Sequence, residues 1–135
     1  MEEVIEISNT IYQEIMEEGK KQLPYEACGL ISGHYNKAQS FWPLVNEIRS
    51  RNKFFVSKKI VQQKIQDILN TREQLLAIFH THPTTAAIPS SYDLRNHPDA
   101  NIDMVIVSYK FDSPQLKWYK IDQSGYKNIS WLLPS

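Results

Sequence analysis

The chain has 135 residues, and its fifteen lysines and arginines are balanced by fifteen aspartates and glutamates, so the formal net charge is zero. This length predicts one domain spanning residues 1–135, and the balance of 41% hydrophobic and 22% charged residues is that of a folded protein. A neutral chain lacks the positive field with which proteins attract nucleic acids and anionic membranes, so neither is an expected partner. The single cysteine allows no internal disulfide and no zinc site of two or four cysteines, and it favours a cytoplasmic location.

In chain order, hydrophobic periodicity and turn residues predict the element order α β β α β α β β β. The first helix begins after Ser8, the second after Ser57 with an apolar stripe from Ile60 to Leu69, and a short third helix begins at Ser90. The predicted strands cover residues 27–32, 38–45, 74–82, 103–108, 115–121 and 126–132. Helices interspersed among mixed strands indicate a layered α/β or α+β sandwich with the sheet in the middle.

The most informative stretch is His80-Thr81-His82-Pro83, at the end of the predicted strand over residues 74–82. Alternate side chains of a strand point to the same face, so both imidazoles point the same way, about 6–7 Å apart along the strand. Two ring nitrogens that lean together can bind one metal ion, and the proline ends the strand so that the pair lies at a rim. Taken alone, however, such a histidine pair is more often simply solvated.

Asp93 follows His82 by eleven residues, and a loop with one helical turn can bring its carboxylate back over the strand end. Two histidines and one carboxylate leave the fourth position of a tetrahedral zinc ion open to water, which is typical of a catalytic site. The alternative for Asp93 is the first turn of the helix that Ser90 caps, where a negative charge is favourable. We expect these two roles to compete for the carboxylate.

A metal-activated water needs a carboxyl group that takes its proton and passes it to the leaving amine. Glu26 is the candidate, since it stands where the first helix gives way to an apolar strand; its alternative is an ordinary surface carboxylate. The hydroxyl of Ser90 can donate to the oxyanion of a tetrahedral intermediate, for about 2.7–4 kcal/mol. Cys28 is expected to be a small buried hydrophobe, and His34 and His97 are expected to be solvated.

The order and spacing of these residues resemble the signature of the JAMM (MPN-plus) metalloprotease family. Its elements here are Pro-Tyr-Glu-Ala-Cys-Gly-Leu at residues 24–30, His-Thr-His-Pro, and Ser-x-x-Asp six residues later. The resemblance implies the MPN fold, a curved mixed β-sheet flanked by helices and related to the cytidine deaminases. It also implies that one Zn²⁺ ion is bound by His80, His82 and Asp93, that Glu26 is the general acid and base, and that Ser90 stabilises the oxyanion.

The chain is near the minimum size for that family. In this it resembles bacterial members, including those that release cysteine from the C-terminus of a ubiquitin-like sulfur-carrier protein. The resemblance therefore implies a zinc-dependent metallopeptidase that hydrolyses a peptide or isopeptide-type amide bond. Its substrate would be a peptide or a ubiquitin-like carrier protein, and the oligomeric state is left open.

Two other functions fit parts of the pattern. A non-catalytic MPN scaffold or binding module would have the same fold, but such relatives have lost metal ligands, whereas every element of the signature is present here. A zinc deaminase would need His-x-Glu and Pro-Cys-x-x-Cys ligands, which a chain with one cysteine cannot provide. The sequence also holds a basic run, usually a solvated face and alternatively a contact for an acidic partner, which consists of Arg49, Arg51, Lys53, Lys58 and Lys59.

Overall fold

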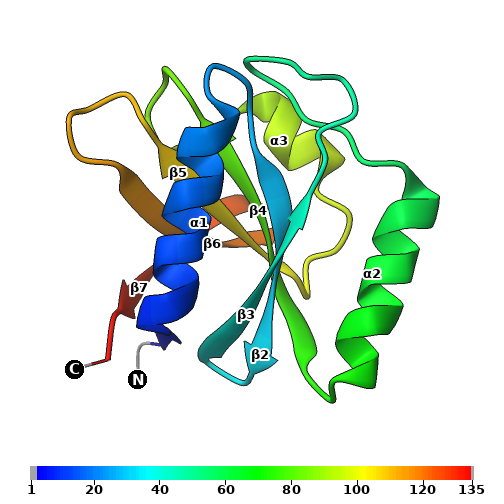
Figure 1. Ribbon diagram of the computed structural model, residues 1–135. Helices are drawn as coiled ribbons and strands as arrows, with labels where there is room; N and C mark the ends of the chain where they lie inside the picture. Colours follow the sequence, from blue (N-terminus) through cyan, green and yellow to red (C-terminus); the bar gives the residue numbers. More distant parts are fainter. Residues whose placement is uncertain (1–2, 135) are drawn as a thin grey trace.

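The computed structural model describes residues 3–134, which form a mixed α+β domain with one closed sheet and helices on both of its faces (Figure 1). The strands are β1 (Val4–Ile7), β2 (Cys28–His34), β3 (Lys37–Leu44), β4 (Gln74–His82), β5 (Asp103–Ser108), β6 (Gln115–Asp122) and β7 (Gly125–Leu132). The helices are α1 (Asn9–Gln22), α2 (Lys58–Asn70) and α3 (Ser91–Asn96). The predicted strands over residues 74–82 and 103–108 have the observed bounds, and the other predicted strands differ by one or two residues at one or both ends.

The element that the sequence prediction missed is β1, which closes the sheet. The strand order is β1-β3-β2-β4-β5-β6-β7, and β1 pairs in parallel with both β3 and β7. Its residues Ile5 and Ile7 are 2% and 0% exposed. Both partner strands lie far from β1 along the chain, so no local turn signal announces it. The expected curved sheet flanked by helices is confirmed, and β1 joins its two ends.

The two faces of the sheet carry different layers. On one face α1 packs over the central strands, where Ile11 and Ile15 join a buried core with Ile31 of β2, Phe79 of β4 and Val105 of β5. The other face is covered by α2 and α3 (Figure 1). The sheet therefore lies between helices, as the sequence indicated.

The three serines expected at helix starts all occupy the N-cap position. The hydroxyl oxygens of Ser8 and Ser90 accept from backbone N–H groups of their helices, whereas Ser57 makes no such side-chain bond. Within residues 3–134 every helix is too short or too polar to pass through a membrane.

The apolar stripe of α2 is only partly buried. Ile68 is fully buried, whereas Ile60 and Leu69 are 41% and 56% exposed. Val61 and Ile65, in the middle of the stripe, are half-buried because they border a groove. The predicted stripe therefore anchors α2 through Ile68 and leaves part of its apolar face uncovered.

Candidate metal centre

The end of β4 carries the predicted histidine pair. His80 and His82 point to the same face of the sheet, their Nε2 atoms lie 3.2 Å apart, and the two residues are 1% and 5% exposed. Between them, the hydroxyl oxygen of Thr81 accepts from Ala27 N at 2.8 Å and ties the end of β4 to the start of β2. β4 is also hydrogen-bonded to β5 along its other edge, so the pair stands on a rigid central strand. The alternative of a solvated strand end is therefore wrong.

α3 brings Asp93 over the end of β4. Asp93 Oδ2 lies 3.1 Å from His80 Nε2 and 3.0 Å from His82 Nε2. The same oxygen accepts from Ser90 N at 3.0 Å, and Ser90 Oγ accepts from Asp93 N at 3.0 Å, which completes a capping box. The expected competition between the helix cap and the histidines does not occur, because the cap itself holds the carboxylate toward them.

The three groups have the chemistry and spacing of metal ligands. His82 Nδ1 lies 2.8 Å from the carbonyl oxygen of Ala86, so Nδ1 carries the hydrogen and Nε2 of the neutral ring presents a lone pair to the carboxylate. A bound cation relieves this contact between two electron-rich atoms. Donor atoms held by one zinc ion at about 2.0–2.1 Å with tetrahedral angles stand about 3.3 Å apart, close to the 3.0–3.2 Å found here. Among residues 3–134, no other group of histidine, cysteine or acidic side chains has this geometry.

The protonation states also suit a metal. Burial alone raises the pKa of Asp93, but its contact with the ring of His80 and its hydrogen bond from the backbone N–H of Ser90 outweigh burial and hold that pKa well below its ordinary value. Burial lowers the pKa of His80, so this ring is neutral at pH 7. Metal ligands require neutral imidazoles and an ionised carboxylate, and the pKa shifts of His80 and Asp93 favour these states.

Glu26 lies at the entry to β2 with its carboxyl group inside the protein. The residue is 2% exposed, and its Oε1 is buried with no hydrogen-bond partner in residues 3–134. Burial, and then the charge of Asp93, raise its pKa from 4.5 to about 9. The alternative of an ordinary surface carboxylate is therefore wrong.

Ser90 stands beside the ligands at the start of α3. Because its oxygen accepts from Asp93 N, its own hydrogen is left to donate outward. A helix cap and a hydrogen-bond donor are thus compatible roles for this serine. The structure brings Ser90 next to the candidate ligand Asp93, and its catalytic role belongs to the proposal below.

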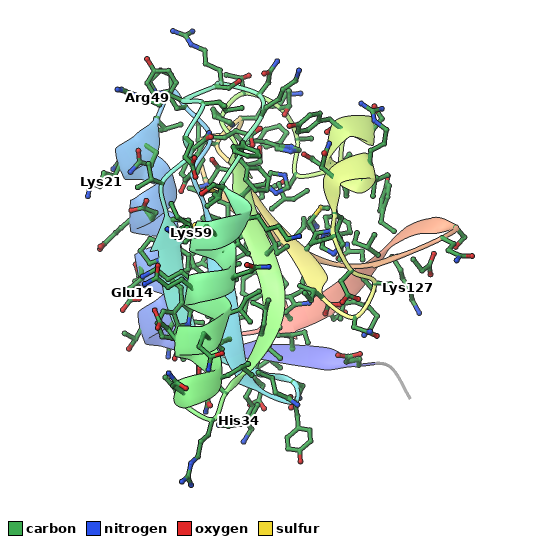
Figure 2. The ribbon with its side chains drawn as sticks, turned by 90° about the vertical axis from the view of Figure 1, so that its right-hand side faces the viewer. Glu14, Lys21, His34, Arg49, Lys59 and Lys127 are labelled. Atoms are coloured by element: carbon green, nitrogen blue, oxygen red, sulfur yellow. The ribbon has the colours of Figure 1, made fainter. Side chains whose placement is uncertain are left out.

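The remaining histidines and the cysteine have no part in the ligand set. Cys28 is 0% exposed, as expected, and burial together with the charge of Glu26 raises the pKa of its thiol to about 12. His34 is exposed as expected, at the opposite end of the molecule from Arg49 (Figure 2). The expectation for His97 is wrong: it is half-buried, and its Nε2 lies 2.5 Å from the carbonyl oxygen of Ile102.

Asn46 is a site residue that the sequence analysis missed. It is 9% exposed, and its Nδ2 donates to Glu26 O at 3.1 Å and to Lys53 O at 3.0 Å. Its Oδ1 accepts from Ile48 N at 3.3 Å and from Phe55 N at 3.1 Å. One carboxamide therefore ties the loop between β3 and α2 to the backbone of Glu26. A lone asparagine in a polar loop gives no sequence signal for such a role.

The same loop carries Phe54, which covers the candidate ligand His80. Its ring stacks on the imidazole of His80, with centroids 5.0 Å apart and an angle of 24° between the planes. This contact and burial at the end of β4 hold the His80 ring in place. His80 Nδ1 is buried with no hydrogen-bond partner in residues 3–134.

A groove of about 530 Å³ leads away from the ligands between α2 and the segment around α3. Its floor is one row of paired strand residues, Leu30 of β2, Ile78 of β4 and Met104 of β5. Val61 and Ile65 of α2 form one wall. The end of the groove at the metal site is lined by Cys28, Phe54, His80, Tyr92 and Asp93. The groove is therefore continuous with the ligand set and mainly apolar beyond it.

Comparison with known families decides what kind of domain this is. Residues 8–120 match the family described as prokaryotic homologs of the JAB domain. The chain belongs to this family. It is a short member of the JAMM/MPN type, as the sequence signature implied. A search of curated proteins with this chain finds no match.

Solved structures agree with the family. A solution structure of a protein from Desulfitobacterium hafniense has 26% identity and a TM-score of 0.89, covering 98% of this chain and 94% of that one. A JAB1/MPN-domain protein from Archaeoglobus fulgidus has 22% identity and a TM-score of 0.66, covering 97% and 100%. A structure described as JAMM, a metalloprotease-like zinc site in the proteasome and signalosome, has 19% identity and a TM-score of 0.64, covering 98% and 100%. The last two, at lower identity, show the shared fold.

Proposed function

We propose that this JAB domain is a zinc-dependent metallopeptidase that hydrolyses a peptide or isopeptide-type amide bond. The observation that carries the proposal is the convergence of His80, His82 and Asp93 on one point, with the buried carboxyl group of Glu26 near enough for the charge of Asp93 to raise its pKa. Three protein ligands leave a zinc ion with an open position, which distinguishes a catalytic site from a closed structural one. Membership in the prokaryotic JAB family supports the same activity.

His80 and His82 through Nε2, and Asp93 through Oδ2, would hold one Zn²⁺ ion. When bound, zinc supplies Lewis acidity that polarises a carbonyl group and makes water acidic near neutral pH. The surrounding contacts prepare the ligands, because the Ala86 carbonyl sets the tautomer of His82 and the backbone of Ser90 holds Asp93. The ligand set therefore needs little rearrangement to accept the ion.

Glu26 moves the proton in this proposal. Its carboxylate takes a proton from the attacking water and returns it to the leaving nitrogen, so one group acts as base and then as acid. The pKa of about 9 belongs to the chain without metal; a divalent cation among the ligands offsets the charge of Asp93 and lowers it toward the range of a working base. The hydroxyl of Ser90 donates a hydrogen bond to the oxyanion.

The groove and Glu26 lie at opposite ends of the histidine pair. The Leu30–Ile78 row of the groove floor lies on the His80 side, whereas Glu26 lies on the His82 side, as the β2–β4 register requires. Because the leaving nitrogen must reach Glu26, the acyl side of the substrate extends the other way, into the groove. Ile78 precedes His80 by two residues, so the floor of the groove lies about 6.6 Å along the strand from the row of His80. An extended substrate would place a side chain two or three residues before the scissile carbonyl over this floor, which suits an apolar side chain.

For the physiological substrate we propose a ubiquitin-like carrier protein with an extended C-terminal tail, of the sulfur-carrier class. A narrow tail can follow the groove to a ligand set that is almost fully buried, whereas a folded surface cannot. The lone, buried Cys28 fits a reducing compartment, so we place the protein in the cytoplasm.

The test combines metal content with turnover. Zinc-loaded protein is incubated with candidate carrier proteins extended past a Gly-Gly terminus, and products are read by intact mass with and without chelator. We expect one zinc per chain and cleavage that the chelator abolishes. Glu26→Gln should keep the metal and lose about 10²–10⁴-fold in kcat. Full turnover by this variant on a confirmed substrate would refute the mechanism.

His80→Ala tests the ligand assignment in the same assay. This variant should lose both zinc and turnover, since two ligands hold the ion far less tightly than three. Zinc content equal to that of the wild type would refute the assignment.

A further inference from the structure

A segment of unpaired positive charge lies beside the groove. Residues 46–59 hold five cations and a single carboxylate, Glu47, in a chain whose net charge is zero. We call the five cations the cationic rim: Arg49, Arg51, Lys53, Lys58 and Lys59. All five side chains are exposed, and none makes an ion pair within residues 3–134.

Two cations of the rim are held over aromatic rings at the site. Lys53 Nζ lies 5.1 Å from the ring centroid of Tyr92, which lines the groove and precedes the ligand Asp93. Arg49 Cζ lies 5.0 Å from the ring centroid of Tyr25, which precedes Glu26. Cation–π contacts of this kind restrict where a long side chain places its charge. These charges therefore stand beside the site and not far out in solvent.

Of the remaining cations, Lys58, the first residue of α2, borders the groove directly. Lys59 is the next residue of α2, and Figure 2 shows it on this helix, with Arg49 on the loop at the top of the molecule. The loop between them is tied down by the four hydrogen bonds of Asn46, so the rim is a fixed feature of the groove.

We propose that the cationic rim selects substrates whose acyl segment carries carboxylate side chains next to the apolar residue in the groove. This inference rests on the proposed function, which directs the acyl segment into the groove. Charges of one sign along a groove speed the encounter with a complementary partner and repel a like-charged one. Apart from the candidate ligand Asp93, the lining residues hold one acid, Asp99, and one cation, Lys58, so Lys53 beside Tyr92 gives the mouth its excess of positive charge. The partner is accordingly a protein with an acidic C-terminal tail.

Matched fluorogenic peptides test the charge preference. The probes are the coumarin anilides of acetyl-Asp-Glu-Leu-Ala-Gly, acetyl-Asn-Gln-Leu-Ala-Gly and acetyl-Lys-Lys-Leu-Ala-Gly. At low salt, kcat/KM for the acidic peptide should exceed that for the basic peptide by about tenfold or more, with the neutral peptide between them. At about 1 M salt, where charges are screened beyond about 3 Å, the three values should converge.

A matched pair of double variants locates the effect. Lys53→Glu with Lys58→Glu should abolish or reverse the preference. Lys37→Glu with Lys127→Glu changes the net charge equally on exposed residues of β3 and β7, and should leave the ratio of acidic to basic peptide unchanged. Equal kcat/KM for all three peptides, or the same loss of preference in both double variants, would overturn the assignment.

Binding separates this inference from the proposed function. Fluorescein-labelled versions of the same peptide acids are titrated with zinc-loaded Glu26→Gln protein and followed by fluorescence polarisation. Selective binding of the acidic peptide that depends on Lys53 and Lys58, without hydrolysis by wild-type protein, would refute the proposed function and uphold the rim. Hydrolysis of all three peptides with equal kcat/KM would uphold the proposed function and refute the selection by the cationic rim. Tighter binding of a single-stranded oligonucleotide than of the acidic peptide would overturn the assignment to an acidic tail.

Discussion

Replacing Asn46 by alanine removes one carboxamide that makes four hydrogen bonds. The side chain donates to the carbonyl oxygens of Glu26 and Lys53 at 3.1 and 3.0 Å, and accepts from the backbone of Ile48 and Phe55 at 3.3 and 3.1 Å. Alanine offers no replacement for any of them. The loop between β3 and α2 then loses its attachment to the entry of β2.

The expected cost follows from the burial of each partner. A hydrogen bond contributes about 0.5–1.5 kcal/mol net, and a buried group left without a partner costs about 1–3 kcal/mol. The bond to Glu26 O is buried, whereas the other three are partly buried and water can replace them in part. We expect Asn46→Ala to lower the free energy of unfolding by about 3–4 kcal/mol, a large share of the about 5–15 kcal/mol of a typical domain.

Urea unfolding of the metal-free protein measures this loss. The midpoint should fall while the slope m stays unchanged, since the surface exposed on unfolding is the same. Asn96→Ala is the control, because Asn96 is exposed and makes one side-chain bond, to Tyr92 O at 2.9 Å. Its cost should stay within about 0.5 kcal/mol. A loss below about 1 kcal/mol for Asn46→Ala, or equal losses for the two variants, would refute the reasoning.

Asn46→Asp separates the contribution of the two donor bonds of Asn46 from that of its two acceptor bonds. Aspartate keeps the two acceptor bonds but turns a carboxylate toward the carbonyl oxygens of Glu26 and Lys53, which raises its pKa in the folded state. The variant should therefore be at least as unstable as Asn46→Ala at pH 7 and should recover below the ordinary pKa of aspartate, where a protonated carboxyl can donate. Stability that rises with pH instead would contradict the assigned donor bonds.

Three further predictions follow from the site and the core. Zinc should raise the melting temperature of the wild type, and His80→Ala should abolish that shift in calorimetry with and without chelator. The pKa of Glu26 is raised from 4.5 to about 9, so the folded metal-free chain keeps a proton that the unfolded chain loses. Its stability should accordingly fall as pH rises from 4.5 through 9, and a melting series in chelator should show a smaller fall for Glu26→Gln. Gly19→Ala should cost about 1–3 kcal/mol in urea unfolding, because the new Cβ would lie 2.8 Å from ring carbons of Tyr109; an unchanged midpoint would contradict this packing.

The local parts of the site could be predicted from the sequence because local geometry decides them. Strand alternation alone puts His80 and His82 on one face, and the N-cap preference of serine alone starts α3 at Ser90. For Asp93 the pattern offered two roles, and the structure combines them, because a capping box turns the carboxylate toward the strand end. Such a combination depends on where α3 sits, which spacing along the chain does not reveal.

The parts that sequence reasoning missed depend on contacts that no sequence pattern reveals. His97 is half-buried because its ring nitrogen meets the carbonyl of Ile102. Asn46 looked like an ordinary loop residue until the fold brought its carboxamide to the backbone of Glu26. The sequence showed the apolar stripe of α2 but not what covers it, and its middle faces a groove between α2 and the segment around α3.

The sequence by itself determined the ligand types, their order and the family to which the chain belongs, because these depend on side-chain chemistry and on spacing within a strand and a short helix. Only the tertiary structure decided that the three ligands meet, that Glu26 is buried beside them and that β1 closes the sheet. Each of these depends on contacts between residues far apart in the chain. Such contacts form when burial of apolar surface brings whole elements together, and no short stretch of sequence contains that information.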